Sequence, residues 1–178
     1  MDPTELVARL QGLHAESFGW ALSQCGWDEP EAEDVLQTAY SRVLAGEARF
    51  GGRSAFRTWL FGVIRRTALE AARRRRKDLQ RTVSLSAVQD VAQGGEGPET
   101  HLERSEAVRS LRAALRCLPT RQREVLHLVF YQDMTIAEAA TVMEVSLGSA
   151  RTHYQRGKAR LRKLLKEEGP GERLQEER

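Results

Sequence analysis

The sequence predicts an all-α protein made of two small helical domains that are joined by an acidic flexible linker. Three observations lead to this prediction. Apolar side chains recur at helical spacing along most of the 178 residues, helix caps and breakers separate these runs, and one Gly-rich stretch without aromatic residues interrupts them. We expect the domains at residues 1–82 and 104–168, the linker at 83–103 and a disordered tail at 169–178.

The distribution of charge indicates nucleic acid as a partner. The net charge of +3 and the pI of about 9.1 are only mildly basic. Residues 28–34 hold five acids and no base, residues 65–81 hold eight Lys/Arg against two acids, and residues 84–103 hold four acids and no Lys/Arg. This alternation predicts two nucleic-acid-binding faces that are separated by a spacer which DNA repels.

Composition also argues against a metal centre and a membrane span. The two cysteines, Cys25 and Cys117, show no metal-ligand spacing, so we expect two reduced and largely buried thiols, no metal and no cofactor. No apolar run approaches the ~18–20 residues that a membrane span needs, and the N-terminus lacks the apolar core of a signal peptide. We therefore expect a soluble intracellular protein.

The N-terminal half predicts two or three helices before residue 45. Residues 4–25 are periodic, with Gly12 or Gly19 as a possible break. Residues 28–30, Asp-Glu-Pro, form a helix start because an acidic cap is followed by a proline that the first turn tolerates. The apolar stripe that follows is Ala32, Val35, Leu36, Ala39, Tyr40, Val43 and Leu44. The polar side chains off that stripe, free for a partner, are Asp34, Gln37, Ser41 and Arg42.

The next predicted helix, residues 56–77, combines an aromatic side chain with many cations. Phe61, Arg65 and Arg66 lie on its flank, and residues 73–77 are all Arg or Lys. This pattern is typical of single-stranded DNA binding, in which cations follow the backbone and a ring stacks on an unpaired base. Packing of Phe61 against another helix is an equal alternative. The basic run could also be a solvated helix end, but five consecutive cations favour an anionic partner.

Residues 134–166 predict a helix-turn-helix. Thr135 and Glu138 form a capping box, Glu144 lies in the turn and Ser146 caps the second helix. On that second helix, one face is apolar and the opposite face carries Arg151, Thr152, Gln155 and Arg156. Seven Lys/Arg and no acid lie between residues 147 and 166, which supplies donors for base edges and cations for phosphates. The alternative is an ordinary surface helix with a solvated basic face.

Three strings in this order resemble bacterial sigma factors of the extracytoplasmic-function (ECF) group. PEAEDVLQTAYSRVL (30–44) resembles the helix that binds the RNA polymerase clamp. FRTWLFGVIRRTALEAARRRRK (56–77) resembles the helix that melts and reads the minus-ten promoter element, in sigma region 2. The string from Leu118 to Leu165 resembles the helix-turn-helix of sigma region 4, which reads the minus-thirty-five element.

The resemblance implies a subunit of bacterial RNA polymerase without a catalytic centre, metal or cofactor. It implies as partners the polymerase core, through its beta-prime clamp and beta flap, promoter DNA and an anti-sigma factor. The anti-sigma factor could hold this otherwise cytoplasmic, nucleoid-associated protein at the inner membrane. The implied polymerase contacts are Asp34, Gln37 and Arg42. The implied minus-ten contacts are Phe61, Arg65, Arg66, Thr67, Arg73 and Arg74. The implied minus-thirty-five contacts are Ser149, Arg151, Thr152, Gln155 and Arg156.

The chain departs from the family pattern at three positions. Thr38 stands where the family commonly has Glu, Arg66 stands where Asn is frequent, and Glu144 stands where the turn usually has Gly. An arginine cannot copy the mixed donor and acceptor edge of an asparagine, so the resemblance does not carry the family's minus-ten sequence over to this chain. If the turn requires positive φ, Glu144 costs roughly 1 kcal/mol there.

Two other classes of protein remain as alternatives. A plain helix-turn-helix regulator would bind a duplex operator tightly without polymerase, but it would not need the Trp59-containing helix with its aromatic and arginine-rich end. An enzyme is disfavoured because His14, His101, His127 and His153 are scattered and assemble no acid–base or nucleophile constellation.

Overall fold

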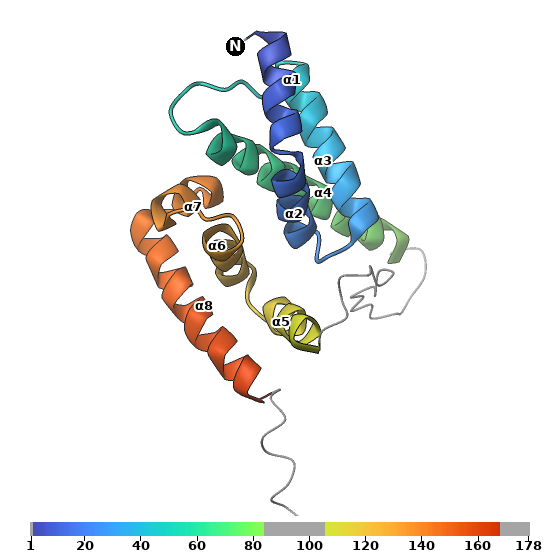
Figure 1. Ribbon diagram of the computed structural model, residues 1–178. Helices are drawn as coiled ribbons and strands as arrows, with labels where there is room; N and C mark the ends of the chain where they lie inside the picture. The colour runs from blue at the N-terminus through green and yellow to red at the C-terminus, as the bar shows by residue number, and fades with distance from the viewer. Residues whose placement is uncertain (1, 84–105, 168–178) are drawn as a thin grey trace, which may run out of the picture. The chain divides into compact units, whose positions relative to one another are not determined.

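The computed structural model describes residues 2–83 and 106–167, and every regular element within these ranges is an α-helix (Figure 1). The helices form two compact units, one with α1–α4 and one with α5, α6, α8 and most of α7. The all-α prediction is therefore confirmed. The linker and tail predicted at 83–103 and 169–178 lie outside the described residues, except that the last helix of the first unit runs through Val83.

The first unit contains α1 (Pro3–Gly12), α2 (His14–Gln24), α3 (Glu29–Leu44) and α4 (Phe56–Val83). Helix α1 ends at Gly12 and α2 begins at His14, so residues 4–25 form two helices rather than one. The predicted start of α3 is confirmed, because Asp28 is its N-cap and the carboxylate accepts a hydrogen bond of 2.9 Å from the backbone N–H of Glu31. Such a cap satisfies one of the donors that a helix leaves unpaired at its N-terminus.

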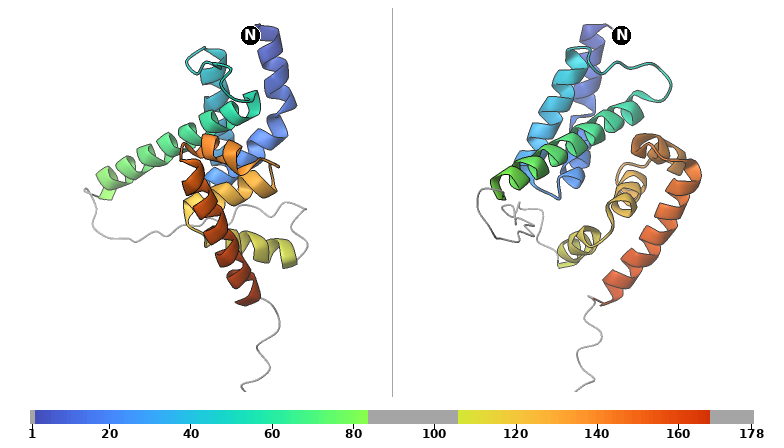
Figure 2. Two further views of the ribbon diagram at one scale, coloured as in Figure 1. Left: turned by 90° about the vertical axis from the view of Figure 1, so that its left-hand side faces the viewer. Right: turned by 180° about the vertical axis from the view of Figure 1, so that it is seen from behind.

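The core of the first unit lies where α2, α3 and α4 pack against one another, and Figure 2 shows α4 as a long helix crossing the other two. Trp20 on α2 has no exposed surface. Its indole Nε1–H donates a hydrogen bond of 3.0 Å to the carbonyl of Phe61 on α4. The two rings also stack, with centroids 6.0 Å apart. This contact fixes α2 on α4 at one defined register.

The second unit contains α5 (Glu106–Arg116), α6 (Thr120–Phe130), α8 (Leu147–Glu167) and most of α7 (Ile136–Met143). The longest helix, α8, packs against α5 and α6. Gly157 permits a close approach to α6, because a Cβ atom there would stand only 3.2 Å from both Gln122 Cβ and Leu126 Cδ1. The face of α8 that contains Gly157 is therefore tightly packed.

The caps predicted for the helix-turn-helix are confirmed. The Glu138 carboxylate accepts hydrogen bonds from the Thr135 backbone N–H at 2.9 Å and from its hydroxyl at 2.7 Å, while Glu138 N–H donates to Thr135 Oγ1 at 3.2 Å. Ser146 Oγ caps α8 by accepting a 3.1 Å hydrogen bond from the backbone of Ser149. The turn residue Glu144 has φ of 55°, so the conditional strain predicted for a non-glycine residue applies.

The two cysteines differ, and the expectation of two buried thiols is wrong for Cys117. Cys25 is buried, and burial, reinforced by the neighbouring Glu31 carboxylate, raises the pKa of its thiol to about 12. Cys117 is exposed because α5 ends at Arg116, which takes the next residue off the buried helical face. Both thiols are free.

Candidate nucleic-acid interface

The outer face of α8 carries the polar side chains expected to contact a DNA duplex. The buried face of the helix includes Ala150 and Gly157. The predicted residues, all exposed, are Ser149, Arg151, Thr152, Gln155 and Arg156. The apolar and polar faces that the sequence predicts for this helix are therefore its buried and exposed faces in the structure.

These side chains fall into two groups according to their hydrogen bonds. Ser149 and Thr152 are held locally, because Ser149 Oγ lies 2.9 Å from Ser146 Oγ and the Thr152 hydroxyl donates to the Gly148 carbonyl at 3.0 Å. Arg151, Gln155 and Arg156 make no hydrogen bond or ion pair within the described ranges. The guanidinium groups of the two arginines and the side-chain amide of Gln155 are therefore available for hydrogen bonds to base edges or phosphates.

An aromatic surface adjoins α8, and the sequence did not reveal it. Phe130 and Tyr131, at the end of α6, each expose 56% of their surface. The Phe130 ring stacks on Tyr154 of α8 with centroids 5.9 Å apart, and Lys158 Nζ lies 5.1 Å from the centre of the Tyr154 ring. The only sequence signal was the pair of adjacent aromatics directly before the loop. Exposed aromatics of this kind suit a protein partner or a nucleic acid.

His127 lies beside this surface but is a packed residue. Its ring stacks on Tyr131 at 5.2 Å, and Gln132 Nε2 lies 3.3 Å from its Nε2. Burial lowers the pKa of the imidazole to about 4, so His127 is neutral at pH 7. A neutral, desolvated imidazole of this kind contributes to packing and adds no positive charge for DNA.

On α4, the residues predicted to contact the minus-ten element divide into exposed and buried sets. The exposed set is Arg66, Arg73 and Arg74, and the buried set is Phe61, Arg65 and Thr67. Phe61 has no exposed surface: its ring stacks on Trp20, and the Arg57 guanidinium carbon lies 5.5 Å from its centre. In this conformation Phe61 is part of the core, which is the alternative that the sequence left open.

The basic run at residues 73–77 is exposed throughout. One of its members, Arg75, forms an ion pair with Glu31 on α3, and the hydrogen bond to that carboxylate raises the pKa of the guanidinium. Arg73 and Arg74 form no ion pair within the described residues. The run therefore combines one structural cation with cations that can attract an anionic partner.

The three residues predicted to contact polymerase also behave differently from one another. Asp34 and Gln37 are exposed on α3 and make no hydrogen bond within the described ranges. Arg42 is partly buried, and its Nη2 atom lies 2.6 Å from Glu70 Oε2 on α4. The expectation that Arg42 is free for a partner is therefore wrong: its guanidinium is already paired within the first unit.

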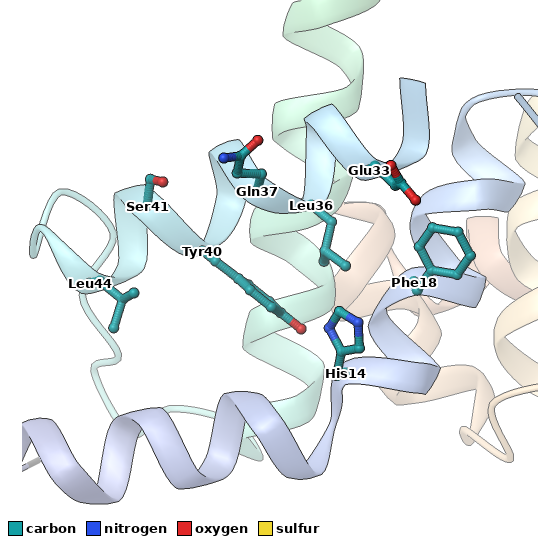
Figure 3. A pocket seen from close by; sticks show the side chains of 8 residues that line it. All are labelled: His14, Phe18, Glu33, Leu36, Gln37, Tyr40, Ser41 and Leu44. Carbon is teal, nitrogen blue, oxygen red and sulfur yellow. The ribbon is translucent and has the colours of Figure 1, made fainter. Parts of the chain in front are cut away.

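An apolar groove of about 620 Å³ lies beside Gln37, between α2 and α3 (Figure 3). The Tyr40 ring extends from α3 towards His14 on α2, and their ring centroids are 6.1 Å apart. The side chains that line the groove are His14, Phe18, Glu33, Leu36, Gln37, Tyr40, Ser41 and Leu44. Leu44 exposes 55% of its surface, so this groove is a candidate binding site for an apolar side chain of another protein.

The described residues offer little support for other kinds of site. Among them, no cluster of three or more His, Cys, Asp or Glu side chains could hold a metal ion. None of the described helices combines the length and apolar character needed to span a bilayer. The exposed cations on α4 and α8 are instead the features of this two-unit helical protein that best fit a nucleic acid as partner.

Comparisons with known proteins identify the family. Residues 17–78 match the model for sigma-70 region 2, and residues 109–161 match the model for sigma-70 region 4. The ECF RNA polymerase sigma factor SigX of Bacillus subtilis is 35% identical over 146 residues, which cover 79% of this chain and 75% of the relative. The ECF sigma factor EcfG of Rhodopseudomonas palustris is 29% identical over 165 residues, covering 93% and 85% of the two chains.

Solved structures show the same fold. The sigma factor RpoE from Bartonella quintana, solved with the anti-sigma factor NepR, aligns with a TM-score of 0.71 at 21% identity, covering 93% of this chain and 99% of that one. CnrH, solved with the cytosolic domain of CnrY, aligns with a TM-score of 0.59 at 24% identity, covering 94% and 89% of the chains. The chain belongs to the ECF RNA polymerase sigma factors. It is a transcription initiation factor and not an enzyme.

Proposed function

We propose that the two units divide the work of promoter reading, with α8 reading the minus-thirty-five duplex and the end of α4 engaging the minus-ten region. The observation that carries this proposal is the outward face of α8, where Arg151, Gln155 and Arg156 are exposed and make no hydrogen bond or ion pair with any residue that the structure describes. Arginine can pair with both acceptors on a guanine edge, and glutamine can pair with an adenine edge. Two neighbouring arginine-bearing turns therefore supply both base contacts and phosphate contacts.

At the minus-ten region, Arg66, Arg73 and Arg74 are the proposed contacts because they are exposed. Cations along one helix can follow the backbone of a separated strand, which fits a role in opening the duplex. Phe61, Arg65 and Thr67 are buried, so we assign them to the shape of α4 rather than to direct contact in this conformation. Arg66 also gives this protein a donor-only side chain at its position, which favours acceptor edges.

For the polymerase, the proposed contact with the beta-prime clamp is the face of α3 with Asp34 and Gln37. The apolar groove beside Gln37 supports this, since a helix of a partner can place apolar side chains in such a groove while polar residues at the rim set its register. The exposed aromatics Phe130 and Tyr131 are the proposed contact with the beta flap.

We also propose regulation by an anti-sigma factor. RpoE is seen bound to the anti-sigma factor NepR, CnrH is seen bound to the cytosolic domain of CnrY, and this chain shares the fold of both. An inhibitor that covers the groove beside Gln37 or the α8 face would block polymerase or DNA. We place the free protein in the bacterial cytoplasm and the active protein at the nucleoid, and an anti-sigma factor anchored in the inner membrane would hold the inactive form there.

The experiment that tests the proposed function is abortive transcription with sigma-free core polymerase. The full chain is added to core enzyme and a library of promoter sequences, and the short RNA products are sequenced. Enrichment of products from templates that share a minus-thirty-five and a minus-ten element supports the proposal. Equal product from all templates, with and without the chain, would overturn it. The variant Arg156→Ala provides the matched control, because it should reduce selection at the minus-thirty-five element alone.

A further inference from the structure

A narrow cleft lies between parts of α3 and α4 beside their packed contact in the first unit, and charged side chains cross it at two points. The cleft has a volume of about 270 Å³ and is lined by residues of both helices, including Asp34 and Arg74. Arg42 on α3 pairs with Glu70 on α4, and Glu31 on α3 pairs with Arg75 on α4. The helix proposed to bind polymerase is thus tied by ion pairs to the helix proposed to engage DNA.

Arg42 holds two successive turns of α4. Its Nη2 atom lies 2.6 Å from Glu70 Oε2, and its Nη1 donates to Thr67 Oγ1 at 3.4 Å. Thr67 and Glu70 are three residues apart, so they lie on the same face of the helix. The Thr67 hydroxyl also donates to the Val63 carbonyl at 3.0 Å, which leaves it oriented to accept from the arginine. The planar guanidinium therefore joins two side chains at a defined geometry.

The contacts that Arg42 makes lie on the part of α4 that is proposed to engage promoter DNA. Arg66 lies one residue before Thr67, and Arg73 and Arg74 lie one turn after Glu70. The turns that Arg42 holds are therefore the turns between the proposed DNA contacts. On α3, in contrast, Asp34 and Gln37 are exposed and make no hydrogen bond or ion pair in the described ranges, whereas the Arg42 side chain is paired and only 27% exposed.

We propose that Arg42 and Glu70 are positioning residues for promoter opening: their pair fixes the DNA-reading turns of α4 on the polymerase-binding helix, and Arg42 does not itself bind polymerase. This inference rests on the proposed function of the two helices. The sequence assigned Asp34, Gln37 and Arg42 together to polymerase binding. In this proposal, polymerase affinity depends on Asp34 and Gln37, whereas the rate of duplex opening depends on the pair of Arg42 and Glu70.

The test uses the full-length chain and measures two quantities for each variant. The first is the Kd for core polymerase, and the second is the rate of open-complex formation at saturating core on a promoter that the wild type selects. We expect Arg42→Ala and Glu70→Ala to keep the Kd within about twofold and to slow opening roughly tenfold. Because both remove the same pair, the double variant should open no more slowly than either single variant.

Three comparisons make the result specific. Asp34→Ala should weaken the affinity for core polymerase. Glu5→Ala removes a carboxylate that pairs with Arg9 at 2.7 Å within α1, and it should change neither quantity, because that pair joins no two helices. The exchanged variant R42E/E70R should recover part of the lost opening rate. Urea unfolding of Arg42→Ala and Glu70→Ala shows that each slow variant is still folded.

The outcomes distinguish this inference from the proposed function. If the wild type gives no promoter-directed initiation, the proposed function fails. If the wild type initiates but Arg42→Ala weakens core binding as Asp34→Ala does, while Glu70→Ala changes nothing, the positioning role is overturned and Arg42 is a polymerase contact. Additive effects of Arg42→Ala and Glu70→Ala on the opening rate would also overturn it.

Discussion

The two units place their predicted DNA-binding residues very differently. On α8, all of the predicted residues are exposed, whereas on α4 Phe61, Arg65 and Thr67 are buried. The difference follows from packing. Helix α8 buries one face against α5 and α6, whereas residues 60–65 of α4, which packs against α2 and α3, are all buried, so that part of α4 is covered on every side. A single apolar stripe therefore predicts the exposed face of a peripheral helix better than that of a central one.

The largest effect expected from the difference between α4 and α8 follows from removing the Phe61 ring on α4. Because Phe61 is fully buried against Trp20, we expect Phe61→Ala to lower the free energy of unfolding of the first unit by about 3–5 kcal/mol. Tryptophan fluorescence during urea unfolding measures this, since all three tryptophans lie on this unit. Leu44→Ala, at a site that is 55% exposed, is the control and should cost far less. A change below about 1 kcal/mol in Phe61→Ala would contradict its place in the core.

The second unit should respond to acid through His127. Its pKa is about 4 in the folded chain and about 6.5 when unfolded, so the unfolded state takes up the proton first as the pH falls. The free energy of unfolding should therefore decrease from pH 6.5 towards pH 4, by at most roughly 3 kcal/mol, and be fully restored above pH 6.5. Hydrogen exchange of the α6 amides at several pH values measures this effect.

The control for this experiment is His127→Gln, which removes the titrating group and keeps a polar side chain beside Gln132. Its α6 amides should lose protection less steeply between pH 6.5 and pH 4. An identical pH dependence in the two proteins would show that another group is responsible.

A smaller effect is expected on the α8 surface. Arg156→Ala should lose about 1–3 kcal/mol of discrimination at the minus-thirty-five element if the guanidinium makes two hydrogen bonds to one base. The affinity of the polymerase complex for matched and mismatched promoters measures the difference. An equal loss on every sequence would instead assign Arg156 to a phosphate. In either case the stability of the unit should be unchanged, in contrast to Phe61→Ala.

The smallest expected effect is at the turn of the helix-turn-helix. Glu144 has φ of 55°, a region that glycine adopts without strain, so Glu144→Gly should stabilise the second unit by about 1 kcal/mol or less. Thermal unfolding monitored by circular dichroism measures the change. Glu144→Ala is the control and should give no such gain, because it keeps a Cβ atom. Destabilisation by glycine would show that the Glu144 side chain contributes more than its backbone strain costs.

These differences explain which features of the fold the sequence could predict. The cap at Asp28 and the capping box of Thr135 and Glu138 were predicted because each depends on residues within a few positions of one another. Strain at Glu144 was expected only if the turn requires positive φ, and the structure shows that it does. Local hydrogen bonds of this kind are specified by short strings of residues. The exposed face of α8 was predicted for the same reason, because one period describes the whole helix.

Other features depend on residues that are far apart in the chain. Phe61 is buried by Trp20, which lies 41 positions away, and Arg42 is paired with Glu70, 28 positions away. Neither contact produces a periodic pattern in the sequence. Phe61 and Arg42 lie off the apolar stripes of their helices, so the sequence alone could not show that each is already packed or paired within the protein. The burial predicted for Cys117 failed for a different reason: α5 ends at Arg116, one residue before the cysteine, so Cys117 does not continue the buried face of the helix.

The central claim is that α4 and α8 read a promoter only as parts of the polymerase complex, and one binding measurement tests it most directly. The affinity of the full-length chain for its selected promoter duplex is measured with and without core polymerase, beside an unrelated duplex of the same length. We expect sequence-specific binding to appear only when core enzyme is present, with weak and salt-sensitive binding by the chain alone. Tight, specific binding of the chain alone, unchanged by core polymerase, would contradict the account.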